Sequence, residues 1–171
     1  MTPSKTLVSG IKPTGRLHIG NYFGAVGQFI KLSEDHESFV FVADLHALTS
    51  LHNPEELRKN ILSVAIDYIA LGLDPKKTIF YFQSENKEVM NTAYEFAKRI
   101  TLNEFEAIYG NADPGKIMAA MTQVADILYP QFRERMPGII PVGIDQDPHI
   151  RLTRDIVRRF KDRKYFLPSA V

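Results

Sequence analysis

The chain has 171 residues, of which 44% are hydrophobic and 24% are charged, enough for one globular domain with a sizeable core. Its 21 basic and 20 acidic residues leave a net charge of +1, so overall charge argues neither for nor against a nucleic-acid partner. Cysteine is absent, which excludes disulfides, thiolate metal sites and a cysteine nucleophile. The N-terminus is too polar for a signal peptide, and no apolar run approaches the roughly 20 residues that cross a bilayer. We therefore expect a cytoplasmic protein without membrane contact.

Strand-like and helix-like segments alternate along the chain. Short runs rich in apolar, β-branched or aromatic residues predict strands at 6–10, 38–44, 77–83 and 137–143. Helical periodicity predicts helices at 19–33 and 54–71, the second with Asn53 as N-cap, and a last helix at 147–160. The first of these helices should bury one face, made of Phe23, Val26, Phe29 and Ile30.

This alternation implies right-handed crossovers and a parallel sheet. The predicted fold class is therefore α/β, a doubly wound, Rossmann-like sheet. Residues 86–128 are almost wholly helix-like, with a break near 109–115, so we expect a helical insertion at about 86–136 between the third and fourth strands. In such sheets ligands bind at the carboxyl ends of the strands. That rule brings three segments to one crevice, at 9–21, 43–49 and 142–150.

The segment "SGIKPTGRLHIGN" joins the first strand to the first helix. Unpaired backbone N–H groups and the helix dipole attract an anion there, while His18 and Asn21 add donors and Gly20 allows close approach, so a nucleotide would fit. Neither a Walker loop nor a dinucleotide fingerprint is present. In the structural alternative, Pro13 and Gly15 only form a turn and His18 only caps the helix. The pattern alone leaves both interpretations open.

The segment "PVGIDQDPHI" follows the fourth strand. Asp145 can accept hydrogen bonds from ribose hydroxyls, and the neighbouring backbone can contact an adenine edge. In the alternative, Asp147 is the N-cap, Pro148 is the first helical residue, and Asp145 and Gln146 form a solvated loop. The two interpretations are compatible, because Asp147 can cap while Asp145 faces a ligand.

Polar residues also interrupt the apolar helix segment "MTQVADIL". Gln123 and Asp126 lie three residues apart on one face, where they need partners such as a ligand amine or N–H, or else neighbouring helices and water. His46 in "DLHALT" is either structural or functional. The five histidines show no metal-ligand spacing with acidic residues, so we expect no protein metal site.

Taken together, these motifs resemble a known family. "SGIKPTGRLHIGNY" is similar to the HIGH-type signature of class I aminoacyl-tRNA synthetases, in the variant ending in Asn that tryptophanyl-tRNA synthetases use. "PVGIDQDPHIRLTRDI" resembles the second segment of that family, and its pattern favours the tryptophan branch over the related tyrosine branch. "DLHALT", "GLDPKKTIFYFQSE" and "VADIL" fall in the expected order, so the resemblance covers nearly all of the chain.

The resemblance implies a HUP-type catalytic domain over residues 1–171. In this family the carboxylate of L-tryptophan attacks the α-phosphorus of ATP, which is a substrate carrying Mg²⁺, and the acyl group then passes to tRNA(Trp), usually in a homodimer. No permanently bound cofactor is implied. The site residues that the resemblance implies are Lys12, Pro13 and Thr14 at ATP; His18, Gly20 and Asn21 at phosphate and ribose, with His18 and Asn21 catalytic; Gly143, Ile144 and Asp145 at adenosine; and Asp126, Gln123 and His46 at the amino acid.

Within that assignment, Asp126 would accept the indole N–H, and Gln123 would hold either the amino group or the indole. Two features depart from the family. Lys12 stands where many bacterial members have Gln, and no "KMSKS"-like lysine loop is present. We therefore expect an incomplete catalytic-domain fragment, weak or inactive on its own. A tyrosine-specific relative and a non-catalytic synthetase-like binding module are the alternatives.

Overall fold

The structure, a computed structural model, describes residues 5–132, 134–160 and 165–170. Five parallel strands form one sheet in the order β3-β2-β1-β4-β5. They are β1 (Thr6–Ile11), β2 (Glu37–Val42), β3 (Thr78–Phe82), β4 (Gly138–Ile140) and β5 (Ser169–Ala170). The order runs outward from β1 in both directions, which confirms the predicted doubly wound α/β class. The exposed two-residue strand β5 was not predicted.

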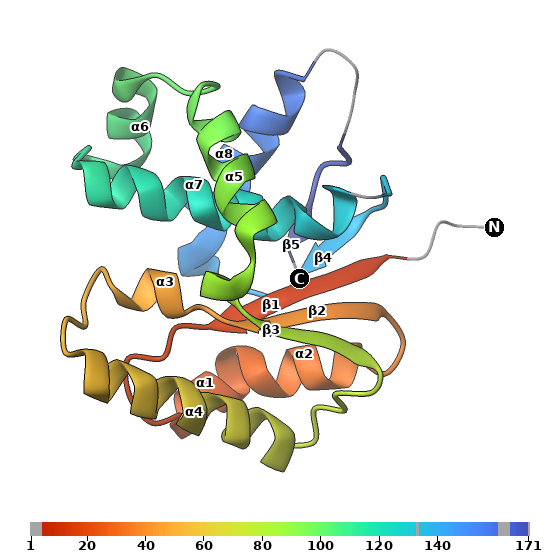
Figure 1. Ribbon diagram of the computed structural model, residues 1–171. Coiled ribbons are helices and arrows are strands. Elements are labelled where there is room, and N and C mark those ends of the chain that lie inside the picture. The colour runs from red at the N-terminus through yellow and green to blue at the C-terminus, as the bar shows by residue number, and fades with distance from the viewer. Residues whose placement is uncertain (1–4, 133, 161–164, 171) are drawn as a thin grey trace.

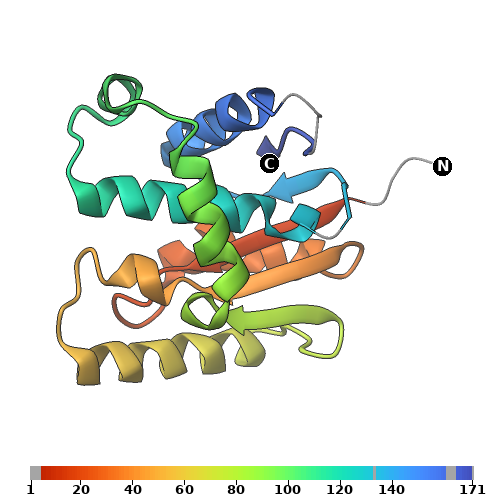
Figure 2. The same cartoon turned by 45° about the horizontal axis from the view of Figure 1, so that its top comes forward.

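Helices cover both faces of the sheet. On one face lie α1 (Ile19–Asn21), the π-helix η1 (Tyr22–Val26), α2 (Gly27–Leu32) and α4 (Pro54–Ala70), and on the other lie α7 (Pro114–Leu128) and α8 (Asp147–Arg158) (Figures 1 and 2). Between β3 and α7 the chain forms η2 (Gln83–Glu85), α5 (Lys87–Ala97) and α6 (Leu102–Tyr109). The remaining short helices are α3 (Asp44–Ala47), η3 (Tyr129–Phe132) and η4 (Ile144–Gln146).

The core follows the two-residue period of the strands. Leu7 packs with Phe29 and Tyr68 below the sheet, whereas the next residue, Val8, packs with Ile127 on the α7 side. Burying both faces explains why the strands carry apolar residues on both sides and do not alternate strictly between apolar and polar. A further buried cluster joins α5, α6, α7 and α8 above the sheet.

Local signals place the helix ends. Asn53 caps α4 by accepting the N–H groups of Glu55 and Glu56, with Pro54 as the first helical residue, as predicted. The predicted break near 109–115 is also present. There Gly110 takes a left-handed conformation at φ 74°, and Asp113 then caps α7.

Two local expectations were wrong. Phe23 is 69% exposed, although Val26 and Phe29 of the same face are buried. Phe23 lies in the π-helical turn, whose wider winding changes the rotational phase of residues on either side of it. Asp147 is not the N-cap of α8 but its first residue, because the preceding 3₁₀ turn η4 leads directly into the helix.

None of the helices in the described ranges is both long and apolar enough to span a membrane.

Candidate active site

A pocket of about 950 Å³ opens at the carboxyl ends of β1, β2 and β4. This is the crevice that the fold class predicts, at the point where the strand order diverges. Nine of the predicted site residues line it, namely Lys12, Thr14, Gly20, Asn21, His46, Gln123, Asp126, Gly143 and Asp145. Pro13 is buried beside it and His18 lies at its rim without lining it. Ile144 belongs to η4, and its side chain is outside the described part of the structure.

The loop after β1 and the start of α1 form the first wall, which we call the helix-start wall (residues 12–24). His18 is the N-cap of α1: its Nδ1 accepts the Gly20 N–H at 3.2 Å, while Asn21 Oδ1 accepts the His18 N–H at 3.0 Å. A neutral imidazole that accepts at Nδ1 carries its proton at Nε2. The capping interpretation of His18 is therefore confirmed, and capping through Nδ1 leaves Nε2 free to donate to a ligand.

Two glycines on the rim of the pocket lie close to functional side chains. A Cβ on Gly20 would lie 3.0 Å from the His18 ring, and one on Gly143 would lie 2.5 Å from Asp145 Oδ1. Any larger residue at either position would therefore require the His18 ring or the Asp145 carboxylate to shift. These contacts give a physical reason for the glycines of "HIGN" and "VGID".

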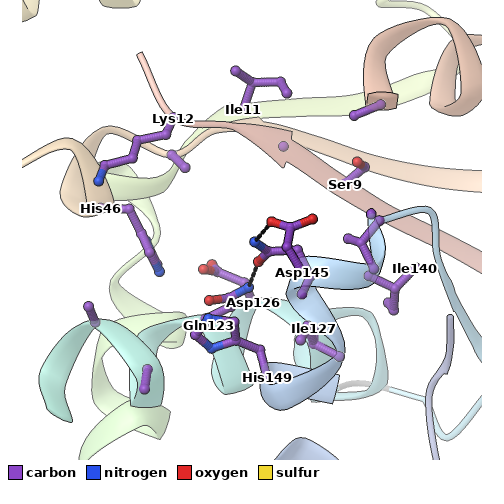
Figure 3. Close-up of a pocket in the computed structure, with 18 of the residues that line it drawn as sticks. Ser9, Ile11, Lys12, His46, Gln123, Asp126, Ile127, Ile140, Asp145 and His149 are labelled. Carbon is purple, nitrogen blue, oxygen red and sulfur yellow. Dashed lines mark hydrogen bonds between the residues drawn. The ribbon is translucent and has the colours of Figure 1, made fainter. Parts of the chain in front are cut away.

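Lys12 supplies positive charge to the same wall. Its Nζ donates to Thr49 Oγ1 at 2.8 Å, and Thr49 in turn donates to the His46 carbonyl at 2.8 Å. Partial burial lowers the pKa of Lys12 below its ordinary value. Figure 3 shows Lys12 and His46 on one side of the pocket, opposite Asp145 and Ile140. The ammonium group is therefore held within reach of an anionic ligand.

Helix α7 forms the second wall, which we call the α7 wall (Gln123 and Asp126). Asp126 is 1% exposed, and its Oδ2 accepts a hydrogen bond from Gln83 Nε2. Its Oδ1 has no hydrogen-bond partner among the described residues. Burial raises the pKa of Asp126 well above its ordinary value, the charge of Asp44 acts in the same direction, and the Gln83 hydrogen bond opposes both. A buried acceptor without a partner costs free energy unless a ligand supplies a donor.

A chain of side-chain hydrogen bonds runs from the α7 wall to η4. Gln123 Nε2 donates to Gln146 Oε1 at 3.0 Å, and Gln146 Nε2 donates to Asp145 Oδ2 at 2.7 Å, as the dashed lines in Figure 3 show. Gln123 and Asp145, which are 22 residues apart by number, are thereby joined through one side chain. The interpretation of Gln146 as a solvated loop residue is incomplete. Its amide connects the α7 wall to Asp145.

Two histidines, His46 and His149, line the pocket. Burial lowers the pKa of His46, whose Nδ1 lies 2.8 Å from Gln83 Nε2. Burial also lowers the pKa of His149, whose Nδ1 lies 2.8 Å from the hydroxyl of Tyr109. The pKa of Tyr109 is raised to about 12 by the same cause. Both rings are therefore uncharged around neutral pH, where they can position a ligand but add no fixed charge.

The sequence reasoning missed Gln83, Tyr109 and His149. Gln83 carried a usable signal, since it directly follows the third strand, to which the strand-end rule was not applied. Tyr109 lies in the segment that was interpreted only as a helix break, and its approach to His149 depends on how α6 packs against α8. Across the described ranges no group of three or more His, Asp or Glu side chains could hold a metal ion.

Comparison with known proteins identifies the family of this chain. The family model described as tRNA synthetases class I (W and Y) matches residues 2–171. A tryptophan–tRNA ligase of Rhodopirellula baltica is 40% identical over 176 residues, covering 96% of this chain and 53% of the relative. The crystal structure of tryptophanyl-tRNA synthetase from Aeropyrum pernix superposes with a TM-score of 0.87 at 38% identity, covering 98% of this chain and 47% of that one.

A second solved structure is a tryptophanyl-tRNA synthetase from Campylobacter jejuni in complex with ADP and tryptophan. It matches with a TM-score of 0.81 at 34% identity, over 97% of this chain and 54% of that one. The chain thus spans about half the length of the relatives it matches. These matches confirm the resemblance on which the site residues were assigned, and the chain belongs to the class I tRNA synthetase family of the tryptophan and tyrosine enzymes.

Proposed function

We propose that the pocket is the amino-acid-activating site of a tryptophan–tRNA ligase, which forms tryptophanyl-adenylate from L-tryptophan and ATP. The observation that carries the proposal is Asp126, a residue that lines the pocket and whose buried Oδ1 has no hydrogen-bond partner within the described ranges. The indole N–H of tryptophan is a donor that matches it, on a ring that is otherwise apolar. The complex of the Campylobacter jejuni relative with ADP and tryptophan supports the same pair of ligands.

In this proposal the two walls take different substrates. The helix-start wall receives ATP: Lys12 contacts phosphate, the outward N–H of His18 and the residues Gly20 and Asn21 hold phosphate and ribose, and Asp145 accepts from the adenosine ribose. The α7 wall receives tryptophan with its indole on Asp126 and its amino group near Gln123. The substrate carboxylate then lies between the walls, where it can attack the α-phosphorus and expel pyrophosphate.

Catalysis in such a site comes from positioning and electrostatics rather than from a protein nucleophile. Mg²⁺ would enter with ATP, held by phosphate oxygens and water, which is how Mg²⁺ is often bound beside nucleotides. We propose three further properties for the whole protein. It transfers the tryptophanyl group to tRNA(Trp), it forms a homodimer, and it is located in the cytoplasm.

Direct binding tests the amino-acid assignment. The chain contains no tryptophan, so the fluorescence of added L-tryptophan reports on the ligand alone. We expect L-tryptophan to bind at least about 10-fold more tightly than L-tyrosine, because the tyrosine hydroxyl projects from the far end of its ring and not from the position of the indole N–H. Tighter binding of L-tyrosine would instead identify a tyrosine-specific relative.

Activation is tested separately, by tryptophan-dependent exchange of labelled pyrophosphate into ATP. Exchange by the 171-residue chain supports adenylate formation. Tight tryptophan binding without exchange, in this chain and in any longer parent protein, would identify a binding module in place of an enzyme.

A further inference from the structure

We propose that Gln83 is a positioning residue for amino-acid selection: it holds one oxygen of Asp126 so that the other faces the pocket, and it fixes the adjacent His46 ring. The inference rests on the proposed function, in which Asp126 Oδ1 receives the indole N–H. Gln83 itself does not line the pocket and would not touch the ligand. Its effect would therefore be transmitted through Asp126.

The position of Gln83 is tightly determined. It is the first residue of η2, directly after β3, and it is 0% exposed. The next residue, Ser84, donates its backbone N–H to Asp44 Oδ1 at 2.9 Å, and its hydroxyl donates to the other oxygen of Asp44. This second contact ties the end of β3 to the start of α3. The Gln83 amide is thereby presented to α7 from a fixed backbone.

The side-chain amide of Gln83 lies between Asp126 and His46 and contacts both. Its Nε2 donates one hydrogen to Asp126 Oδ2 and lies 2.8 Å from His46 Nδ1, while its Oε1 accepts the His46 backbone N–H at 3.3 Å and lies 3.0 Å from the same Nδ1. The arrangement that uses both amide hydrogens gives the second one to Nδ1, which places the imidazole proton on Nε2. Every polar atom of Gln83 then has a partner, and Asp126 keeps one open oxygen.

Two physical consequences follow for Asp126. Without the donor, its carboxylate could rotate about the Cβ–Cγ bond and share its charge differently between the two oxygens. Burial also favours the protonated form of Asp126, and the Gln83 hydrogen bond is the contact that counteracts it. Gln83 therefore favours a carboxylate that is both oriented and able to accept.

The test compares L-tryptophan with its isostere in which sulfur replaces the indole N–H, 3-(benzothiophen-3-yl)alanine. Binding of each is measured by calorimetry to the wild-type chain and to Gln83→Leu, which has a similar size but no polar atoms. The wild type should prefer tryptophan by roughly 10-fold or more, as expected for a hydrogen bond to a buried acceptor. Gln83→Leu should reduce this preference to about 3-fold or less, with ADP affinity unchanged.

A matched control is available in Gln131→Leu. Gln131 is also buried, but its amide bonds to the backbone of Phe166 far from the pocket. This variant should lower stability as a buried glutamine loss does, and it should keep the wild-type preference for tryptophan over the isostere.

A second variant, Gln83→Glu, supplies a pH readout and covers the case in which Gln83→Leu does not fold. The introduced carboxyl group can donate to Asp126 only when the pair holds a proton, so the preference for tryptophan should be lost near pH 8 and regained toward pH 5. The preference of the wild type should change less over that range. A purely structural role of Gln83 gives no reason for such acid rescue.

The inference is overturned if folded Gln83→Leu keeps the wild-type preference, or if it weakens tryptophan and the isostere equally. It is also overturned if Gln83→Glu keeps the preference at pH 8 or shows no acid rescue. Failure of the proposed function looks different, since the wild type itself would then bind both ligands equally. That result removes the role of Asp126 and the role of Gln83 together.

Discussion

The helix-start wall and the α7 wall meet in one pocket but satisfy their polar groups in opposite ways. On the helix-start wall, the His18 side chain accepts the Gly20 N–H, the Asn21 side chain accepts the His18 N–H, and both lie near solvent. On the α7 wall, Asp126 is buried and leaves one oxygen without a partner. Polar groups near solvent can bind many different anionic ligands. A buried acceptor without a partner, in contrast, disfavours every ligand that lacks the matching donor.

Asp126→Asn should produce the largest effect, because Asn keeps the shape but can turn an amide N–H toward the indole N–H. We expect tryptophan affinity to fall roughly 100-fold, which corresponds to about 3 kcal/mol. ADP affinity should stay within about 2-fold if the walls act separately. Ligand fluorescence measures the first and calorimetry the second.

The control is Asp155→Asn, which removes an exposed carboxylate that pairs with Arg158 outside the pocket. It should leave both affinities unchanged. Equal losses of tryptophan and ADP affinity in Asp126→Asn would mean that the walls do not act as separate sites.

His18→Ala changes the other wall and should show the reverse pattern. It removes both the helix cap and the outward Nε2–H donor, so we expect about 10-fold weaker ADP binding with tryptophan affinity unchanged. His52→Ala, at an exposed histidine outside the pocket lining, is the control. If only tryptophan affinity fell, His18 would contact the amino acid and not the nucleotide, which would contradict this assignment.

Lys12→Met should have a smaller effect on the same wall. Since a lysine near solvent contributes mainly charge, ADP affinity should fall about 3-fold at low salt and the difference should shrink as salt rises. Lys31→Met, at an exposed position of α2, is the matched control because it removes the same charge. An effect of Lys12→Met that does not depend on salt would contradict this charge-based role.

The buried carboxyl of Asp126 should also affect the pH dependence of stability in the absence of ligand. The pKa of Asp126 is raised in the folded chain, so the unfolded chain releases this proton first as pH increases. Its contribution therefore destabilises the fold progressively from about pH 4 up to the folded pKa. Thermal unfolding of Asp126→Asn should show a flatter decline over that window than the wild type. An equal decline of stability with pH in both proteins would show that burial does not raise the pKa of Asp126 in the folded chain.

The sequence was sufficient for the four longer strands, for α4 with its Asn53 cap and for the crevice at the strand ends. These features depend on short-range patterns and on one topological rule. The exposure of Phe23 could not be predicted, because it depends on a π-helical turn that the periodicity of the segment does not reveal.

The site shows the same division. Asp126 could be singled out because a carboxyl on an apolar helix face needs a partner. The strand-end rule could have brought Gln83 to the crevice, but it could not predict the pairing with Asp126, because the two residues are 43 positions apart and meet only when β3 and α7 pack together. Candidate residues therefore followed from local chemistry and their expected roles from the family resemblance, whereas their hydrogen-bond partners followed from the fold.

The most direct measurement uses L-tryptophan labelled with ¹⁵N at the indole nitrogen, bound to the unlabelled chain. Because the protein has no tryptophan, the one indole N–H signal comes from the ligand. A hydrogen bond to Asp126 Oδ1 should move the indole proton downfield and slow its exchange with water, and Asp126→Asn should abolish both changes. A bound ligand whose indole proton keeps the shift and exchange rate of free tryptophan would contradict the account.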